Sequence, residues 1–397
     1  MSQKKMVPRQ SPILGGRLPK RKQWAATCWL SPSAGVRREP ESGYDQAMIA
    51  FTFWHPTARR WLGKKPSLTS LVVAAAVRAS LWGLAVCWVT ATLQADEPTP
   101  RPLPFPSELV EFGPASRVPL FTGGGAEAWD RDLRERGWIM REGGRWHLWY
   151  TGYNRAANSP RLLGYASSAD GLNWTRSPAN PLIGDAWVED MCVVREGGRY
   201  VMVAEGEQDI AHLLTSADRV HWQRHGPLDI RLSTGAPIAD GPRGTPVLWR
   251  EHGLWHLFYE RIDKGIWLAT SSDLKVWTNV QDDPVMECGP AEHDSREIAF
   301  NQIVKHCGHY YAYYHASARP GQWCSCIAAS DDLRHWQKYS GNPVLPVDPA
   351  VPAASSPLLV PDGNRHRLYT THPDVRVRFS VLPVTGAAAT VGSAAGR

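Results

Sequence analysis

Carboxylates recur in this sequence at positions that could share one catalytic pocket. Residues 129–138, WDRDLRERGW, hold six charged side chains in ten positions, and further acidic residues end or begin apolar runs in WVEDMCVV, VMVAE and LFYE. General acid–base cleavage of a glycosidic bond requires two such groups, one protonated and one ionised. The candidates for the catalytic roles are Asp130, Asp132, Asp190, Glu205 and Glu260.

Aromatic and basic side chains accompany these carboxylates along the chain. Indole rings can pack on the apolar face of a sugar, although a single tryptophan is more often part of a core. The predicted substrate-binding residues are Trp129, Arg134, Trp187, Glu189, Arg243, Asn301 and His315. The sequence contains no Gly-rich phosphate loop, nucleophile elbow, H-E-x-x-H motif or C-x₂-C pair, so no metal ligand set is predicted.

A repeat of about 55 residues determines where these side chains must lie. A glycine followed by an aromatic-rich run recurs at Gly144, Gly198, Gly253, Gly308 and Gly363. An Asp-x₃-Trp marker follows in the first four units, ending at Trp174, Trp222, Trp277 and Trp336. Such a period indicates a repeat architecture, and short alternating runs with glycine turns predict about four antiparallel strands per unit.

Five radial units of four antiparallel strands predict an all-β, five-bladed β-propeller. An open all-β solenoid is the alternative. It is disfavoured because the fifth unit lacks its Asp-x₃-Trp marker, while the strand-like residues 107–121 stand at the right end of the chain to complete that unit. In a propeller the innermost strands line a channel, so the first four repeats should bring their carboxylates to one mouth. Crowding there should push their pKa values apart.

The repeats also resemble a known group of enzymes. The stretches SADGLNW and WHLWYTGY, with an acidic residue opening the inner strands, are similar to the five-bladed propeller glycoside hydrolases, which include family 43 arabinanases and xylosidases and family 32 invertase-like enzymes. The resemblance covers about residues 105–383. It implies that Asp132, or Asp130, is the base or nucleophile, and that Asp190 orients and tunes the acid.

The third role, that of the general acid, departs from the family pattern. The expected Glu-Gly-Pro falls on Gly244-Thr245-Pro246, which has no carboxylate, and Asp240-Gly241-Pro242 stands four residues early. Glu260 is therefore the first choice for the acid and Glu205 the second. Without the acid, the stereochemical outcome cannot be inferred from the sequence.

These observations predict an exported glycosidase that acts on an oligo- or polysaccharide. One alternative is a glycoside phosphorylase, with Arg134, Arg136 and Arg243 as the phosphate pocket. Another is a sugar-binding propeller that has lost its acid. No cofactor is required, although such folds can hold a structural cation in the central channel.

The charge distribution argues against a nucleic-acid partner. The formal net charge is +6, but residues 1–95 hold 14 of the 44 basic and 3 of the 38 acidic residues, which leaves 30 basic and 35 acidic residues in the rest of the chain.

The basic flank and the apolar run at 71–93 predict a signal peptide or membrane anchor at 67–95, which would place the protein in the periplasm or outside the cell. We further predict a basic extension (1–66), a Pro-rich linker (96–106), the propeller (107–384) and a disordered tail (385–397).

Overall fold

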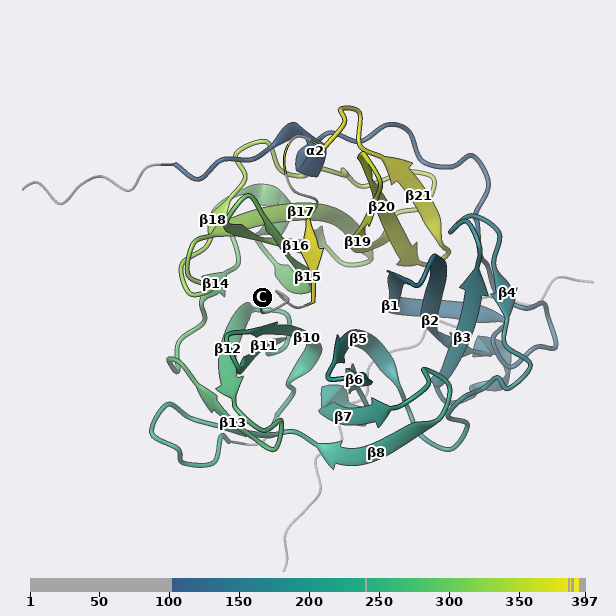
Figure 1. Cartoon of the computed structure of the whole chain (residues 1–397), viewed down its shortest axis with the longest axis horizontal. Coiled ribbons are helices and arrows are strands. Elements are labelled where there is room, and N and C mark those ends of the chain that lie inside the picture. The colour runs from purple at the N-terminus through teal and green to yellow at the C-terminus, as the bar shows by residue number, and fades with distance from the viewer. Residues whose placement is uncertain (1–101, 240, 385, 387–388, 393–397) are drawn as a thin grey trace, which may run out of the picture. The chain divides into compact units, whose positions relative to one another are not determined.

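The computed structural model describes residues 102–239, 241–384, 386 and 389–392 of the chain. The predicted basic extension, the signal peptide or anchor and most of the linker lie outside the described residues. Among the helices of the described part, none combines the length and the apolar character needed to cross a bilayer. Five β-sheets radiate from a common axis, which confirms the predicted five-bladed propeller (Figure 1).

Each blade is an antiparallel sheet whose strands follow one another along the chain. Blade 1 consists of β1 (Asp132–Glu142), β2 (Arg145–Tyr153), β3 (Leu162–Ser168) and β4 (Thr175–Arg176). Blade 2 consists of β5 (Glu189–Glu196), β6 (Arg199–Glu205), β7 (Ala211–Ser216) and β8 (Trp222–Pro227). Blade 3 consists of β10 (Gly244–Glu251), β11 (Leu254–Glu260), β12 (Gly265–Ser271) and β13 (Val276–Asn279), with β9 (Asp229–Arg231) and β14 (Met286–Glu287) added at its edges.

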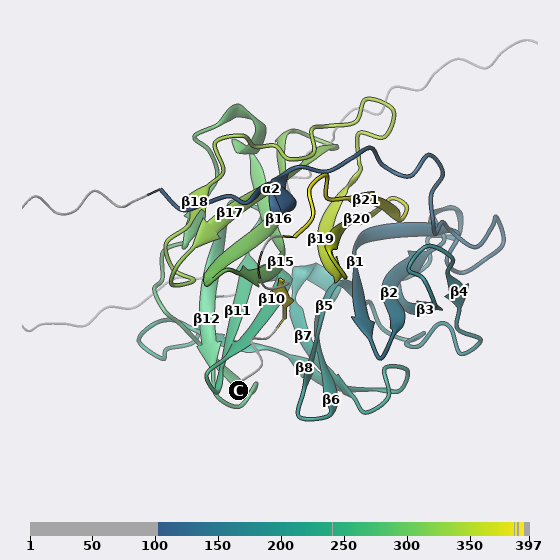
Figure 2. The same cartoon turned by 45° about the horizontal axis from the view of Figure 1, so that its top comes forward.

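Blade 4 consists of β15 (Glu297–His306), β16 (His309–Arg319), β17 (Gln322–Ser330) and β18 (Gln337–Lys338). Blade 5 consists of β19 (Ser355–Asp362), β20 (Arg365–His372) and β21 (Arg376–Phe379). Short 3-10 turns cover Arg155–Ala157, Glu207–Asp209 and Glu292–Asp294. The first strand of each blade lies nearest the axis in both views (Figures 1 and 2).

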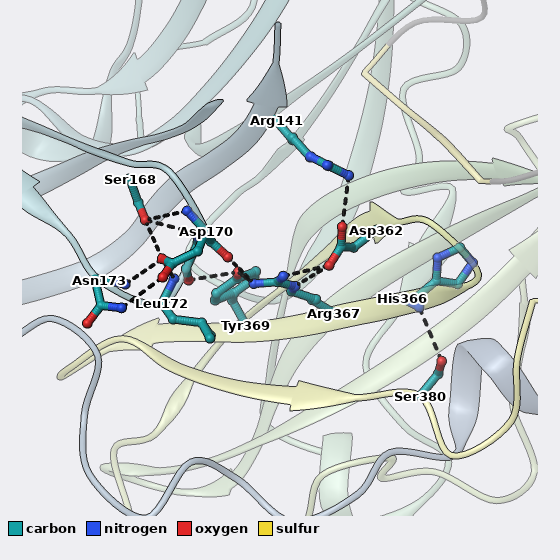
Figure 3. A network of polar contacts seen from close by, with 11 residues as sticks. Arg141, Ser168, Asp170, Leu172, Asn173, Asp362, His366, Arg367, Tyr369 and Ser380 are labelled. Carbon is teal, nitrogen blue, oxygen red and sulfur yellow. Dashed lines mark hydrogen bonds and ion pairs between the residues drawn. The ribbon is translucent and has the colours of Figure 1, made fainter. Parts of the chain in front are cut away.

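The repeated sequence markers have local structural roles. The five repeat glycines stand in the hairpins between the first and second strands with φ between 62° and 90°, a region that other residues rarely adopt. In the Asp-x₃-Trp marker of blade 1, Asp170 Oδ1 accepts hydrogen bonds from the main-chain N–H groups of Leu172 and Asn173, both at 2.8 Å (Figure 3). The same turn recurs at Asp218, Asp273 and Asp332.

Residues from the start of the described chain complete blade 5. The N–H groups of Gly113, Ser116 and Leu120 donate to the carbonyls of Phe379, Val377 and Val375 at 2.9, 2.9 and 2.7 Å. This confirms that the 107–121 segment closes the ring along β21. The segment is not a strand throughout, because Ser107–Val110 form the short helix α2, which buries Leu109 and Val110.

Blades 5 and 1 are also joined by side chains (Figure 3). Arg367 of β20 pairs with Asp362 and donates from Nη1 to the carbonyl of Asp170 in blade 1 at 2.6 Å. Arg141 of β1 pairs with the same Asp362 at 2.8 Å. Ring closure therefore rests on ion pairs and main-chain hydrogen bonds together.

The end of the chain departs from the prediction that residues 385–397 do not pack. Strand β22 (Thr390–Val391) pairs with β15, and the carbonyl of Gly392 accepts a hydrogen bond from Arg250 N at 3.0 Å. An inner strand leaves one edge of main-chain donors and acceptors unpaired, and even small residues can pair with such an edge.

Candidate functional site

The first strands of the blades become irregular at one common level of the channel. Register shifts interrupt β1, β5, β10 and β15 near their starts. Positive φ angles of 48°, 49° and 43° occur at the shifts of blades 1 to 3, at Glu135, Asp190 and Thr245, which stand one repeat apart, and Ser356 of β19, two repeats after Thr245, has a φ of 66°. Non-glycine residues rarely adopt such φ angles, and they concentrate where a site demands a special geometry.

The Arg136 side chain fills the channel at this level. It is fully buried, and its guanidinium donates to main-chain carbonyls of three other blades. The acceptors are the carbonyls of Asp190 and Met191 in blade 2, Pro246 in blade 3, and Phe300 and Asn301 in blade 4. The register shifts therefore turn these carbonyls toward the axis, and the positively charged guanidinium of Arg136 donates the hydrogen bonds that they accept.

Three buried carboxylates gather beside this arginine. Each of Glu189, Asp190 and Glu205 has an oxygen within 4.8 Å of the others. Asp190 Oδ1 accepts a hydrogen bond from Arg136 N at 3.0 Å, and Glu205 Oε2 accepts one from Thr245 N at 2.9 Å. Glu189 is held between Arg134 (3.0 Å) and Arg161 (2.6 Å).

Burial sets the protonation of this group. Burial, followed by the charge of Asp190, raises the pKa of Glu189 to about 8. Burial and the charge of Glu135 raise the pKa of Asp190 to about 6. Burial and the charges of Asp190 and Glu189 raise the pKa of Glu205 well above its ordinary value. Carboxylates so close together cannot all be ionised at neutral pH.

A fourth buried carboxylate, Glu260, meets Glu205 at the position where the family pattern expects the acid. A Cβ added to Gly244 would lie 2.2 Å from Glu260 Oε1 and 2.6 Å from Glu205 Oε2. Both carboxylates therefore occupy the space that a side chain at 244 would need. Burial, followed by the charge of Asp263, raises the pKa of Glu260 to about 8.

The cluster offers oxygen ligands of the kind that divalent cations prefer. Each oxygen of Glu189, however, already faces a guanidinium, and the level of the inward carbonyls is occupied by Arg136. The arrangement is better suited to proton transfer, because it combines buried carboxyls of raised pKa with Asp132 and Glu135, which are only partly buried.

Two of the residues predicted from the sequence lie within blade 1 instead of in this group. Asp130 is 2% exposed and accepts hydrogen bonds from Arg176 Nε (2.7 Å) and Tyr150 Oη (2.9 Å). Trp129 stacks on Tyr150 with ring centroids 6.0 Å apart. Asp130 stands in the turn before β1 and its carboxylate is held by Arg176 and Tyr150 of the same blade, so it stabilises the fold.

The remaining predicted residues lie around the mouth. Asp132 stands at its rim and accepts a hydrogen bond from Arg155 N at 3.1 Å. Trp187 packs under the guanidinium of Arg161, 3.7 Å from its ring centroid. Arg243 is half-exposed, and its main chain pairs with that of Asp209.

Asn301 and His315 form a buried pair in blade 4. Asn301 Nδ2 donates to His315 Nδ1 at 3.0 Å. Burial, followed by the charge of Arg136, lowers the pKa of His315 to about 3, so the ring is neutral.

Sequence reasoning missed Glu135 and Asp263. Glu135 belongs to the ring of positive-φ positions, pairs with Arg134 at 3.1 Å, and donates from its main-chain N to His372 Nδ1 at 2.7 Å. The charge of Glu135 contributes to raising the pKa of both Asp190 and Asp263. The repeat length could have identified Glu135, because it stands one period before Asp190, whereas nothing in the sequence singled out Asp263.

No protein-family model matches the chain, and no curated protein matches it in sequence. Solved structures do match. A candidate glycosidase from Bacteroides thetaiotaomicron has a TM-score of 0.58 at 17% identity, over 70% of this chain and 98% of its own. A candidate glycoside hydrolase from Parabacteroides distasonis has a TM-score of 0.54 at 17% identity, over 64% and 88%.

The chain has the propeller fold of these glycosidase-like structures. The same fold recurs in a β-1,2-mannobiose phosphorylase from Listeria innocua, with a TM-score of 0.50 at 14% identity, over 62% of this chain and 89% of that one. The resemblance seen in the repeats is thus confirmed for the fold, which hosts both candidate hydrolases and a phosphorylase. The chemistry must be argued from the side chains at the mouth.

Proposed function

We propose that the protein cleaves glycosidic bonds, with Glu260 as the proton donor. Glu260 is 4% exposed, and its raised pKa of about 8 keeps the carboxyl protonated at neutral pH. A general acid must hold a proton to give to the leaving oxygen. The observation that carries the proposal is the meeting of Glu260 and Glu205 at Gly244. Glu205 ends β6 and Glu260 ends β11, and their carboxyls lie where the family pattern places the acid.

The ionised partner comes from blade 1 in this proposal. Glu135 projects at the same level as Asp190, and Asp132 stands at the rim above it. Either carboxylate could activate a water or attack the sugar, since both are part of the mouth and neither is fully buried. Asp190, held by the main-chain N of Arg136, would orient the acid and tune its pKa.

Phosphorolysis is the second candidate, because a structure with this fold is a phosphorylase. A phosphate co-substrate needs free cationic side chains. Two of the three arginines predicted for that purpose are engaged: Arg136 is bound to carbonyls, and Arg134 pairs with both Glu135 and Glu189. This engagement favours water over phosphate as the acceptor.

The test is a turnover screen of the full chain on aryl glycosides and neutral oligosaccharides, with and without phosphate. Glu260→Gln should lower turnover by about 10²-fold or more, because an amide N–H is far too weak an acid to protonate the leaving oxygen. Glu251→Gln is the matched control, since Glu251 is equally buried but lies at the far end of β10, where it bonds Lys305.

Equal turnover by Glu260→Gln and the wild type would contradict the assignment of the acid. Release of sugar only when phosphate is present would establish the phosphorylase. Sugar binding without turnover on any substrate would favour the non-catalytic propeller.

A further inference from the structure

A pocket on blade 2 opens beside the candidate site. It has a volume of about 660 Å³, within the range of roughly 300–1,000 Å³ that is typical of small-ligand sites. Its inner end includes Glu205, a member of the carboxylate group. Its walls come from the segment before β5, the turn after β6, and the strands β7 and β8. The pocket therefore shares Glu205 with the carboxylate group and extends over the blade.

Trp187 provides an aromatic wall in this pocket. The guanidinium of Arg161 lies 3.7 Å from its ring centroid and holds the indole from one side. Arg161 is itself fixed by its ion pair with Glu189, so the ring is anchored to the carboxylate group. The indole Nε1 is itself buried, so the ring, and not this donor, is what Trp187 offers to a ligand.

The turn at the lip of the pocket exposes polar side chains. Gln208 and Asp209 have φ angles of 62° and 56°, and the corresponding turn of blade 3 has 50° and 57° at Ile262 and Asp263, so this conformation belongs to the repeat. Gln208 and the neighbouring Glu207 both line the pocket and are exposed, so their polar groups are available to a ligand.

The charges of the lining select the kind of ligand. Asp185 and Glu207 contribute exposed carboxylates, and Glu205 contributes a buried carboxyl whose pKa is raised well above its ordinary value, while the arginine in the lining, Arg224, already pairs with Asp185 at 3.0 Å. An anionic sugar would meet net negative charge here. A neutral sugar could pack on Trp187 and give its hydroxyls to the carboxylates.

We propose that this pocket is a subsite for a neutral sugar residue of an oligosaccharide whose neighbouring bond lies at the carboxylate group. The proposal rests on the proposed function and deepens it. It makes the substrate class a neutral oligosaccharide, with at least one sugar bound over blade 2 in addition to the residue at the channel mouth. Uronic and sulfated chains are disfavoured.

The test compares the full-length protein on a neutral oligosaccharide and on the matching aryl glycoside, which lacks the second sugar that the pocket would hold. For the wild type, kcat/KM should be at least about tenfold higher for the oligosaccharide. Trp187→Ala should remove most of this advantage. The matched control is Trp267→Ala, which removes a half-buried indole of blade 3 outside the pocket. This variant should keep the higher kcat/KM for the oligosaccharide.

A second variant covers the case in which Trp187→Ala does not fold. Glu207 is exposed, so Glu207→Arg should leave folding intact. It should raise relative turnover of a uronic-acid oligosaccharide several-fold without affecting the aryl glycoside, because it reverses one charge of the lining.

The subsite is refuted if the preference for the oligosaccharide is unchanged in Trp187→Ala and Glu207→Arg leaves selectivity as it was. If no substrate is turned over, the proposed function fails. Calorimetric binding of the oligosaccharide to the wild type and to Trp187→Ala then tests the subsite independently of turnover. Binding that is lost in Trp187→Ala supports the pocket, and binding that is absent or unaffected refutes it.

Discussion

Replacing Arg136 by methionine should destabilise the propeller more than any surface substitution. The guanidinium is fully buried and donates to five main-chain carbonyls from three blades. Methionine fills part of the volume but donates no hydrogen bond, so these buried acceptors lose their partner. Each unsatisfied buried group costs about 1–3 kcal/mol. The burial cost of the charge is recovered at the same time, so the net loss should be about 3–5 kcal/mol, as for other broken buried charge clusters.

Urea unfolding followed by tryptophan fluorescence measures this loss. The midpoint should shift with little change in the slope of the transition. Arg136→Lys should not restore stability, because one ammonium cannot reach acceptors in three blades. The control is Arg141→Met, which removes a 41% exposed arginine paired with Asp362 and should cost at most about 1 kcal/mol.

The reasoning is refuted if Arg136→Met and Arg141→Met lose equal stability. A loss confined to turnover, with the unfolding midpoint unchanged, would mean that Arg136 serves the site without holding the blades together.

Two further predictions concern the carboxylates. The pKa of Glu260 is raised from its ordinary value of 4.5 to about 8, so Glu260 binds its proton more tightly in the folded state. Its contribution to the free energy of unfolding is therefore full below about pH 4.5 and is lost as the pH rises through about 8. The protein should thus unfold at lower urea at about pH 9 than at about pH 5, and Glu260→Gln should reduce that difference; an unchanged difference would rule out Glu260 as its source. Gly244→Ala should lower turnover by about 10²-fold, because the new Cβ would displace the oxygens of Glu205 and Glu260. Gly113→Ala, where the nearest atom would be 3.7 Å away, should have no effect on turnover, and equal activity in both variants would show that the two glutamates need not meet at position 244.

The repeat predicted the fold well because it reports on turns, and turns are local. Glycines with positive φ and the Asp-x₃-Trp turn each depend on a few adjacent residues, so five blades and their strand order follow from spacing alone. The closing segment was found by the same logic, from a unit that lacked its last element. The helix at the start of this segment, α2, was not predicted, because it is stabilised by the burial of Leu109 and Val110 against residues distant in the sequence.

The site was predicted less completely, because bulges decide which side chains enter the channel. Asp190, Glu205, Glu260 and Glu189 were expected at one mouth from their regular positions relative to the hairpin glycines. The structure brings Glu189, Asp190 and Glu205 together and puts Glu205 and Glu260 at Gly244, while their roles stay predictions. In β1 the bulge directs Glu135 and Arg136 to the axis, and the turn before the strand holds Asp130 against Arg176 within the blade. A one-residue error in alternation exchanges the two faces of a strand, and nothing in WDRDLRERGW marks where the alternation breaks.

The closure of blade 5 has a consequence for how the chain reaches this structure. The contacts that complete the ring join residues about 260 positions apart, as between Arg376 and the carbonyl of Ser116. Bringing such distant segments together costs conformational entropy that nearby hairpins do not require, and proteins with many such contacts fold slowly. Blades 1 to 4 can each form from a continuous stretch of about 50 residues, whereas blade 5 must wait for both ends of the propeller. The carboxylates of blades 1, 2 and 3 would then stand exposed until the last blade closes, so the acquisition of activity should report the final step of folding.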